Sequence, residues 1–258
     1  MRCSALFASC LASAVLAATG AIAGPPDTPT ISPHAQELTC APRLLDRNDS
    51  TAPRVLGGRD RYSPGMFGPR EVIVLSSGDG SLAAGQLYVA YRRVRSRVWT
   101  TEERFVEDTA QNAGIVRIDS VIGDKATATI VWACDGVDVN DRLEPFAPSE
   151  APMPATGAFP ADSATLTPAL AGASVQLAQH DRRAGAARDL MLVSRVQGQD
   201  VAPGQRVAFF RRYQRDGGPV SVLGEGVVQS VGERTYLVQI VGSRDAIEAG
   251  DLVGPASR

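Results

Sequence analysis

The stretch REVIVLS at residues 70–76 has a counterpart in RDLMLVS at residues 188–194. In both stretches an arginine and an acidic residue precede an uninterrupted apolar run of strand length. Short continuous apolar runs are typical of strands that lie in a buried ladder. Because such a strand occurs in each half of the chain, the sequence indicates an internal repeat, and this repeat decides the predicted fold.

The similarity continues in the same order through both halves of the chain. The matched positions are 84–93 with 203–212, 120–125 with 229–234, Asp141 with Asp251, and Pro145 with Pro255. The offset between the copies changes only between matched segments, where loops of different length are expected. A duplicated module explains this preserved order better than chance similarity between two strand-rich segments.

Each copy has the pattern of short antiparallel strands. Runs rich in β-branched residues are separated by glycine turns such as Gly123-Asp124 and Gly232-Glu233. A sheet of this size must protect its edges, as small closed barrels and sandwiches do. We therefore predict an all-β fold with two tandem small β-barrel or sandwich modules related by internal duplication, after a signal peptide and a disordered linker. The connection at residues 95–112 is predicted to hold a helical turn or a longer hairpin.

The N-terminal sequence has the pattern of an export signal. Arg2 precedes an apolar run from Ala5 to Ala18, and the small-x-small pattern of Ala21-Ile22-Ala23 stands before Gly24. A membrane anchor is the alternative, but the apolar run is shorter than the ~20 residues of a spanning helix. We therefore predict export to the periplasm or cell envelope, with no transmembrane segment after signal cleavage.

Composition divides the rest of the chain at two segments rich in proline. The predicted segments are the signal peptide at 1–23, a linker or disordered segment at 24–52, the first β-module at 53–146, a Pro/Ala-rich linker at 147–172, and the second β-module at 173–258. The first linker has no apolar period that would support a helix or strand. In the second, prolines spaced through 147–160 prevent a regular ladder or helix.

Two cysteines remain once the signal peptide is removed. They are Cys40 and Cys134. In an oxidising compartment two thiols are expected to form a disulfide. The alternative is two unrelated cysteines, one buried in a strand and one near the N-terminus.

The glycine turns and strand motifs of the first copy resemble a known family. The segments that carry the resemblance are 55–75, 84–92, 114–118 and 137–146. They are similar to the C-terminal region of bacterial exported proteins that carry peptidoglycan-binding LysM domains, and a related small-barrel pattern closes the flagellar assembly protein T. No separate LysM segment is recognised in the chain. The resemblance covers most of the mature chain and implies a cell-envelope setting and a non-enzymatic module.

The sequence contains no recognisable catalytic or metal-binding pattern. The only histidines are His34 and His180, and neither has cysteines or carboxylates at ligand spacing or a neighbouring nucleophile-elbow motif. We therefore predict no catalytic residue, no metal and no cofactor. The alternative is an envelope glycan hydrolase that uses surface carboxylates such as Asp141 and Asp251, since glycosidases need two carboxylates. For both aspartates, the simpler interpretation is a turn residue that bonds its own backbone.

Arginines and aromatic residues gather at matching places in the two copies. The candidate ligand-binding residues are Arg92, Arg93, Arg95, Arg97 and Trp99 in the first copy, and Arg211, Arg212, Tyr213 and Arg215 in the second. Arginine pairs with phosphate or carboxylate groups, and an aromatic ring stacks on a sugar. The predicted partner is an envelope protein or an anionic cell-wall glycan.

The alternative for these arginines is that they keep a hairpin tip soluble and protect an edge strand. A net charge of −2 argues against a nucleic-acid partner, because that function needs a strongly basic surface. No oligomeric state follows from the sequence.

Overall fold

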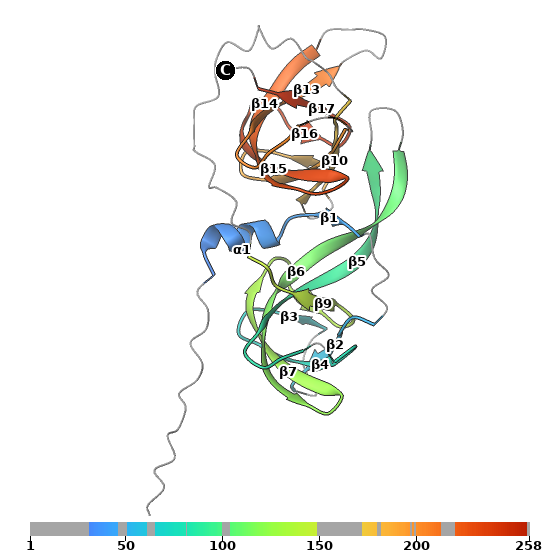
Figure 1. The fold of residues 1–258 in the computed structure, drawn as a ribbon, viewed down its shortest axis with the longest axis vertical. Helices are drawn as coiled ribbons and strands as arrows, with labels where there is room; N and C mark the ends of the chain where they lie inside the picture. Colours follow the sequence, from blue (N-terminus) through green and yellow to red (C-terminus); the bar gives the residue numbers. More distant parts are fainter. Residues whose placement is uncertain are drawn as a thin grey trace, which may run out of the picture.

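A computed structural model describes most of the chain. The described residues are 31–45, 51–60, 65–80, 82–99, 104–148, 172–179, 182–196, 198, 200–212 and 220–256; for Trp99, Arg104 and Phe105 only the backbone is described. The described part is an all-β structure with one short helix, α1 (Pro33–Thr39) (Figure 1). The predicted fold class is therefore confirmed. The predicted signal peptide at 1–23 lies outside the described residues, as does most of the linker at 147–172.

The first barrel is built from a curled antiparallel sheet with the order β2-β4-β7-β6-β5-β9. A pair of two-residue strands, β3 and β8, covers part of it, and β1 pairs with β6. The strands are β1 (Arg43–Leu44), β2 (Val55–Gly58), β3 (Met66–Phe67), β4 (Val72–Ser76), β5 (Leu87–Trp99), β6 (Arg104–Ile122), β7 (Lys125–Ala133), β8 (Val137–Asp138) and β9 (Arg142–Pro145).

The second barrel repeats this arrangement, except that no strand described in it corresponds to β1. Its sheet has the order β10-β12-β15-β14-β13-β17, and β11 pairs with β16 as β3 pairs with β8. Its strands are β10 (Val175–Ala178), β11 (Ala184–Gly185), β12 (Leu190–Ser194), β13 (Arg206–Arg212), β14 (Val220–Val231), β15 (Thr235–Ser243), β16 (Ile247–Glu248) and β17 (Leu252–Pro255).

In each barrel an isolated bridge joins the two ends of the sheet. In the first barrel Arg54 pairs with Arg142, and in the second Ser174 pairs with Leu252. These bridges bring the outer strands of each sheet together, so that little of either edge is left open to pair with another chain.

Each barrel encloses its own hydrophobic core. Ile73 and Ile130 lie in the first core, and Phe209 and Val238 lie in the second. Burying side chains of this size stabilises a fold by about 1.5–3 kcal/mol each. Because the two cores share no residue, each barrel has the packing that a separate folding unit needs.

Two equivalent turns show how the repeated sequence determines the repeated backbone. Gly85 precedes β5 with a φ of 82°, and Gly204 precedes β13 with a φ of 83°. Side chains rarely adopt this left-handed conformation, whereas glycine reaches it at little steric cost. Glycine at both positions therefore gives both copies the same entry into the strand.

The first barrel differs from the second by a long hairpin. Strands β5 and β6 have 13 and 19 residues, whereas their counterparts β13 and β14 have 7 and 12. We call the additional part, residues 92–99 and 104–111, the arm. It extends past the first barrel and runs beside the second (Figure 1). The long connection expected at 95–112 is thus a hairpin rather than a helical turn.

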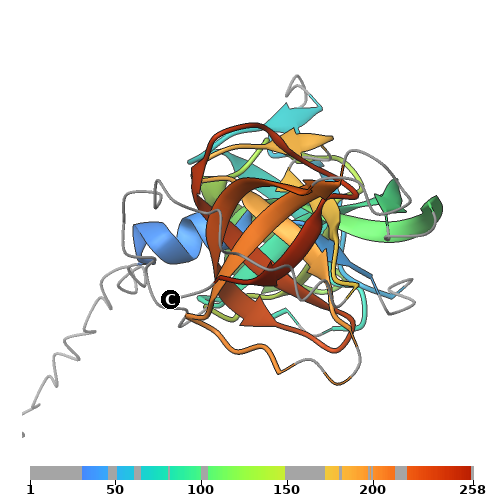
Figure 2. The ribbon, with the colours of Figure 1, turned by 90° about the horizontal axis from the view of Figure 1, so that it is seen from above.

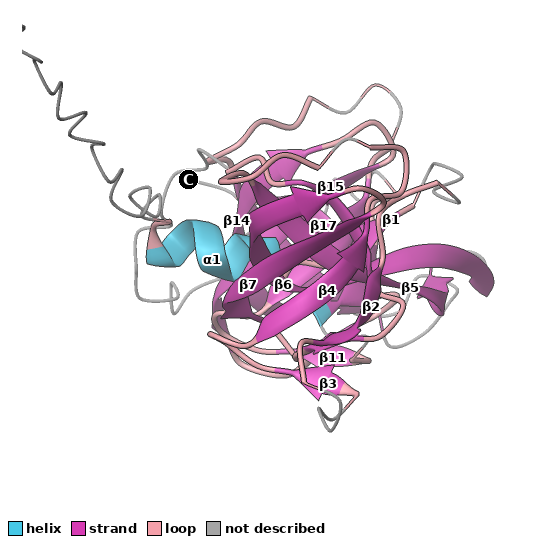
Figure 3. Ribbon diagram, turned by 90° about the horizontal axis from the view of Figure 1, so that it is seen from below, coloured by secondary structure: helices cyan, strands magenta, loops and turns pink. Residues whose placement is uncertain are grey.

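A short N-terminal segment lies at the junction of the two barrels. Residues 31–45 belong to the segment 24–52 that was predicted as a linker or as disordered, and they contain α1 and β1. Views along the long axis of the molecule show α1 on one side and the arm on the opposite side (Figure 2, Figure 3). The two barrels are therefore contacted at their junction by two separate elements.

Candidate functional site

The predicted disulfide is present and lies at the junction. Cys40 and Cys134 are joined by an S–S bond of 2.04 Å, with their Cα atoms 5.5 Å apart. Cys40 caps the C-terminus of α1, and Cys134 follows the last residue of β7. The bond therefore ties the end of α1 to the first barrel.

Two of the candidate arginines form bidentate pairs with buried aspartates. In the first barrel the Arg92 guanidinium donates from Nε to Asp141 Oδ1 and from Nη2 to Asp141 Oδ2, both at 3.0 Å. The backbone N–H of Asp138 also donates to Asp141 Oδ2, at 2.7 Å. The Asp141 side chain is only 2% exposed. Bidentate pairs of this kind combine strength with a fixed geometry.

The second barrel contains the same pair. Arg211 donates from Nε and Nη2 to the two Asp251 oxygens at 2.9 and 2.8 Å, and the backbone N–H of Glu248 donates to Asp251 Oδ2 at 2.6 Å. We call the two arrangements the arginine latches. Each latch joins a strand, β5 or β13, to the turn before the last strand of its barrel, β9 or β17.

The surroundings of the latches shift the proton equilibria of their members. Burial raises the pKa of the Asp141 carboxyl, and the hydrogen bond from Arg92 opposes this effect. In the second latch the hydrogen bond to Asp251 raises the pKa of Arg211. An enclosed, arginine-bound carboxylate offers little surface to an external glycan, so this geometry adds no support for a hydrolase based on Asp141.

Sequence analysis identified the members of both latches but missed that they pair. Arg92 and Arg211 were candidate ligand-binding residues, while Asp141 and Asp251 were interpreted as turn residues. The signal that links them is their retention at equivalent positions in both copies. The structure therefore gives Arg92 and Arg211 partners within the fold.

Three further arginines share one exposed face of the arm. Side chains alternate between the faces of a strand, so Arg93, Arg95 and Arg97 point to solvent while Ser96 and Val98 are buried on the other side. We call the three the arginine face. The structure thus brings these three predicted residues together.

Asp108 of β6 pairs with the arginine face. Asp108 lies within hydrogen-bonding distance of Arg93 and 3.9 Å from Arg95, whose side chain is 83% exposed. The hydrogen bond from Arg93 lowers the pKa of the Asp108 carboxyl. No described residue forms an ion pair with Arg97. Arg95 and Arg97 therefore present accessible guanidinium groups on this face.

The remaining candidate residues are only partly described. Arg212 is exposed at the end of β13. Trp99 is the last residue of β5, with its backbone alone described, and Tyr213 and Arg215 lie outside the described residues.

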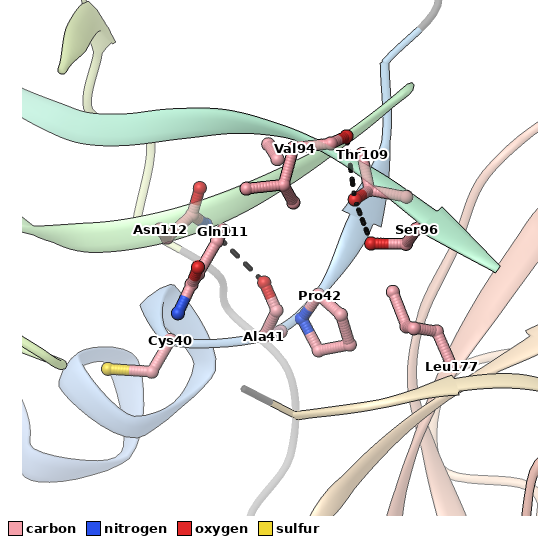
Figure 4. A pocket seen from close by; sticks show the side chains of 10 residues that line it. Cys40, Ala41, Pro42, Val94, Ser96, Thr109, Gln111, Asn112 and Leu177 are labelled. Carbon is pink, nitrogen blue, oxygen red and sulfur yellow. Dashed lines mark hydrogen bonds between the residues drawn. The ribbon is translucent and has the colours of Figure 1, made fainter. Parts of the chain in front are cut away.

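A small pocket opens at the junction beside the disulfide (Figure 4). It lies between Cys40, Ser96, Thr109 and Asn112 of the first half and Leu177 of β10. Asn112 Nδ2 donates to the Thr39 carbonyl at 2.7 Å, while its buried Oδ1 has no partner among the described residues. At about 10 Å³ the pocket is close to the lower limit for one water molecule, far below the size of a ligand site.

Within the described ranges, no group of three or more histidine, cysteine or acidic residues is placed to hold a metal ion. The helix of this part of the chain is too short to cross a membrane. No family model and no curated protein matches the chain. The resemblance to LysM-carrying proteins stays a prediction.

Proposed function

We propose that this protein is a non-enzymatic structural or binding module of the cell envelope and that its ligand is an anionic polymer, such as a cell-wall glycan. The observation that carries the proposal is the arginine face. Its three guanidinium groups repeat on one side of an extended strand, where alternate residues are ~6.6–6.8 Å apart. Such a row suits a linear ligand with repeated negative charges.

The arm holds these side chains in a fixed array. Strand β5 pairs with β6 from Leu87, opposite Arg117, to Trp99, opposite Arg104. A backbone that is already ordered loses little conformational entropy when a ligand binds. Guanidinium groups can also form two parallel hydrogen bonds with a carboxylate or phosphate.

The envelope setting is supported by the disulfide. Bonds such as Cys40–Cys134 persist in oxidising compartments and are rare in the cytosol. The export signal predicted at 1–23 and the resemblance to exported LysM-carrying proteins point to the same compartment.

Retention on isolated cell-wall material tests the proposal. The triple variant Arg93→Gln/Arg95→Gln/Arg97→Gln should be retained at least about tenfold more weakly at low salt, because three exposed charges at ~0.5 kcal/mol each correspond to that factor. Added salt should weaken retention of the parent protein by screening.

A matched control removes the same charge elsewhere. The variant Arg59→Gln/Arg182→Gln/Arg183→Gln changes three exposed arginines outside the arm and should be retained like the parent protein. Equal retention of the arm variant and the parent, or equal losses in both variants, would reject the arginine face as the binding surface.

A further inference from the structure

The helix α1 connects the two barrels in two different ways. Leu38 and Ala41, in and just after α1, pack against Leu190 and Leu237 on the outer face of the second barrel, in a cluster separate from both cores. Glu37 lies 3.8 Å from Arg188 of the same barrel. The disulfide ties Cys40, at the C-terminal end of α1, to Cys134 of the first barrel. Helix α1 thus fastens one barrel to the other.

Alone, α1 is too short to be stable. It has seven residues, and isolated helices shorter than ~12–15 residues are marginal in water. Its N-cap is Ser32, whose hydroxyl accepts from Ala35 N at 3.2 Å. The helix therefore depends on its attachments at the junction.

The non-covalent attachments to the first barrel lie at and beyond the end of α1. Asn112 donates to the carbonyl groups of Thr39 and Ala41, and β1 pairs with β6 through Arg43 and Leu44. These contacts hold residues 39–45 in place. Among the described residues, no hydrogen bond joins the first turns of α1 to the first barrel.

Neither cysteine belongs to a barrel core. Cys40 and Cys134 are absent from both core clusters, and each sheet is closed by its own bridge. Both cysteines are also partly exposed, so that a small reductant can reach the bond. Breaking the disulfide would therefore loosen the junction while leaving both barrels intact.

We propose that the Cys40–Cys134 disulfide is a redox-controlled link that holds α1 in place at the junction between the barrels. A dithiol reductant supplies two electrons and two protons: the S–S bond breaks, two thiols form, and the dithiol closes to a cyclic disulfide. The end of α1 then loses its covalent link to the first barrel, and the short helix, held only by non-covalent contacts, opens more often. This inference does not depend on the arginine face.

Hydrogen exchange of the full chain, with and without dithiothreitol, tests whether the disulfide holds α1 in place. After reduction, verified by thiol alkylation, the amides of residues 35–39 should exchange at least about tenfold faster. Peptides from β13 of the second barrel, which lies outside the loop closed by the bond, should exchange as before. The double variant Cys40→Ser/Cys134→Ser should exchange rapidly in α1 without reductant and should not respond to dithiothreitol.

Two results would overturn the proposal. Unchanged exchange in α1 after complete reduction would mean that the non-covalent contacts alone hold the junction. Equally faster exchange in β13 would mean that the bond stabilises the second barrel itself rather than its attachment.

Discussion

Removing the guanidinium of one latch should destabilise its barrel markedly. In Arg92→Met, the Asp141 carboxylate loses two charge-assisted hydrogen bonds while its side chain stays 2% exposed. Breaking a buried ion pair by removing one partner costs about 3–5 kcal/mol. Because the Arg92 side chain is 31% exposed and water partly replaces it, we expect ~2–3 kcal/mol. For a protein of this size the melting temperature should fall by roughly 4–12 °C.

Urea unfolding followed by circular dichroism measures this cost, with Arg97→Met as the matched control. Arg97 is exposed and has no ion pair among the described residues, so its substitution should change the free energy of unfolding by less than about 0.5 kcal/mol. Arg211→Met should repeat the Arg92→Met effect in the second barrel. A cost for Arg92→Met no larger than that for Arg97→Met would refute the structural role of the latch.

Three further perturbations test other parts of the structure. Gly85→Ala should destabilise by ~1–2 kcal/mol in thermal unfolding, because its φ of 82° is unfavourable for alanine although no atom lies within 4 Å of the new Cβ; an unchanged melting temperature would contradict this. In carboxyl-detected NMR titrations, the pKa of Asp108 should lie below its ordinary value of 3.8 and the pKa of Asp141 above it. The lowered pKa of Asp108 stabilises the fold above the unfolded-state pKa, and this stability is lost as the pH falls through the folded-state pKa. The raised pKa of Asp141 stabilises the fold below the unfolded-state pKa, and this stability is lost as the pH rises through the folded-state pKa. The opposite order of the two pKa values would exclude this assignment. Cys40→Ser/Cys134→Ser should lower the free energy of unfolding by up to ~4–5 kcal/mol, since the bond closes a loop of 94 residues; a loss below about 1 kcal/mol in urea titrations would show that the unfolded chain gains little freedom.

The fold could be predicted from the sequence because the repeat is visible in local patterns. Apolar runs, glycine turns and their order are short-range signals, and both copies carry them. One detail differs between the copies. In β12 the residues Leu190–Val193 are buried on both faces, whereas in β4 Val72 and Val74 are only half-buried. At Leu190 the difference arises because α1 covers the outer face of the second barrel, which no local pattern reveals.

The latches and the junction could not be predicted because they depend on distant partners. Arg92 lies 49 residues from Asp141, and Arg211 lies 40 residues from Asp251. Their pairing follows only from the curvature that brings β5 beside β9. Helix α1 was missed because contacts with the second barrel stabilise it, while its proline-rich surroundings carry no apolar period.

The position of the disulfide has a consequence for the order of maturation. Both cysteines precede the second barrel in the chain, so in an oxidising compartment the bond can form as soon as the first 134 residues are present. The leucines that α1 covers are made only later. Formation of the covalent link therefore does not require the leucine surface that α1 later covers.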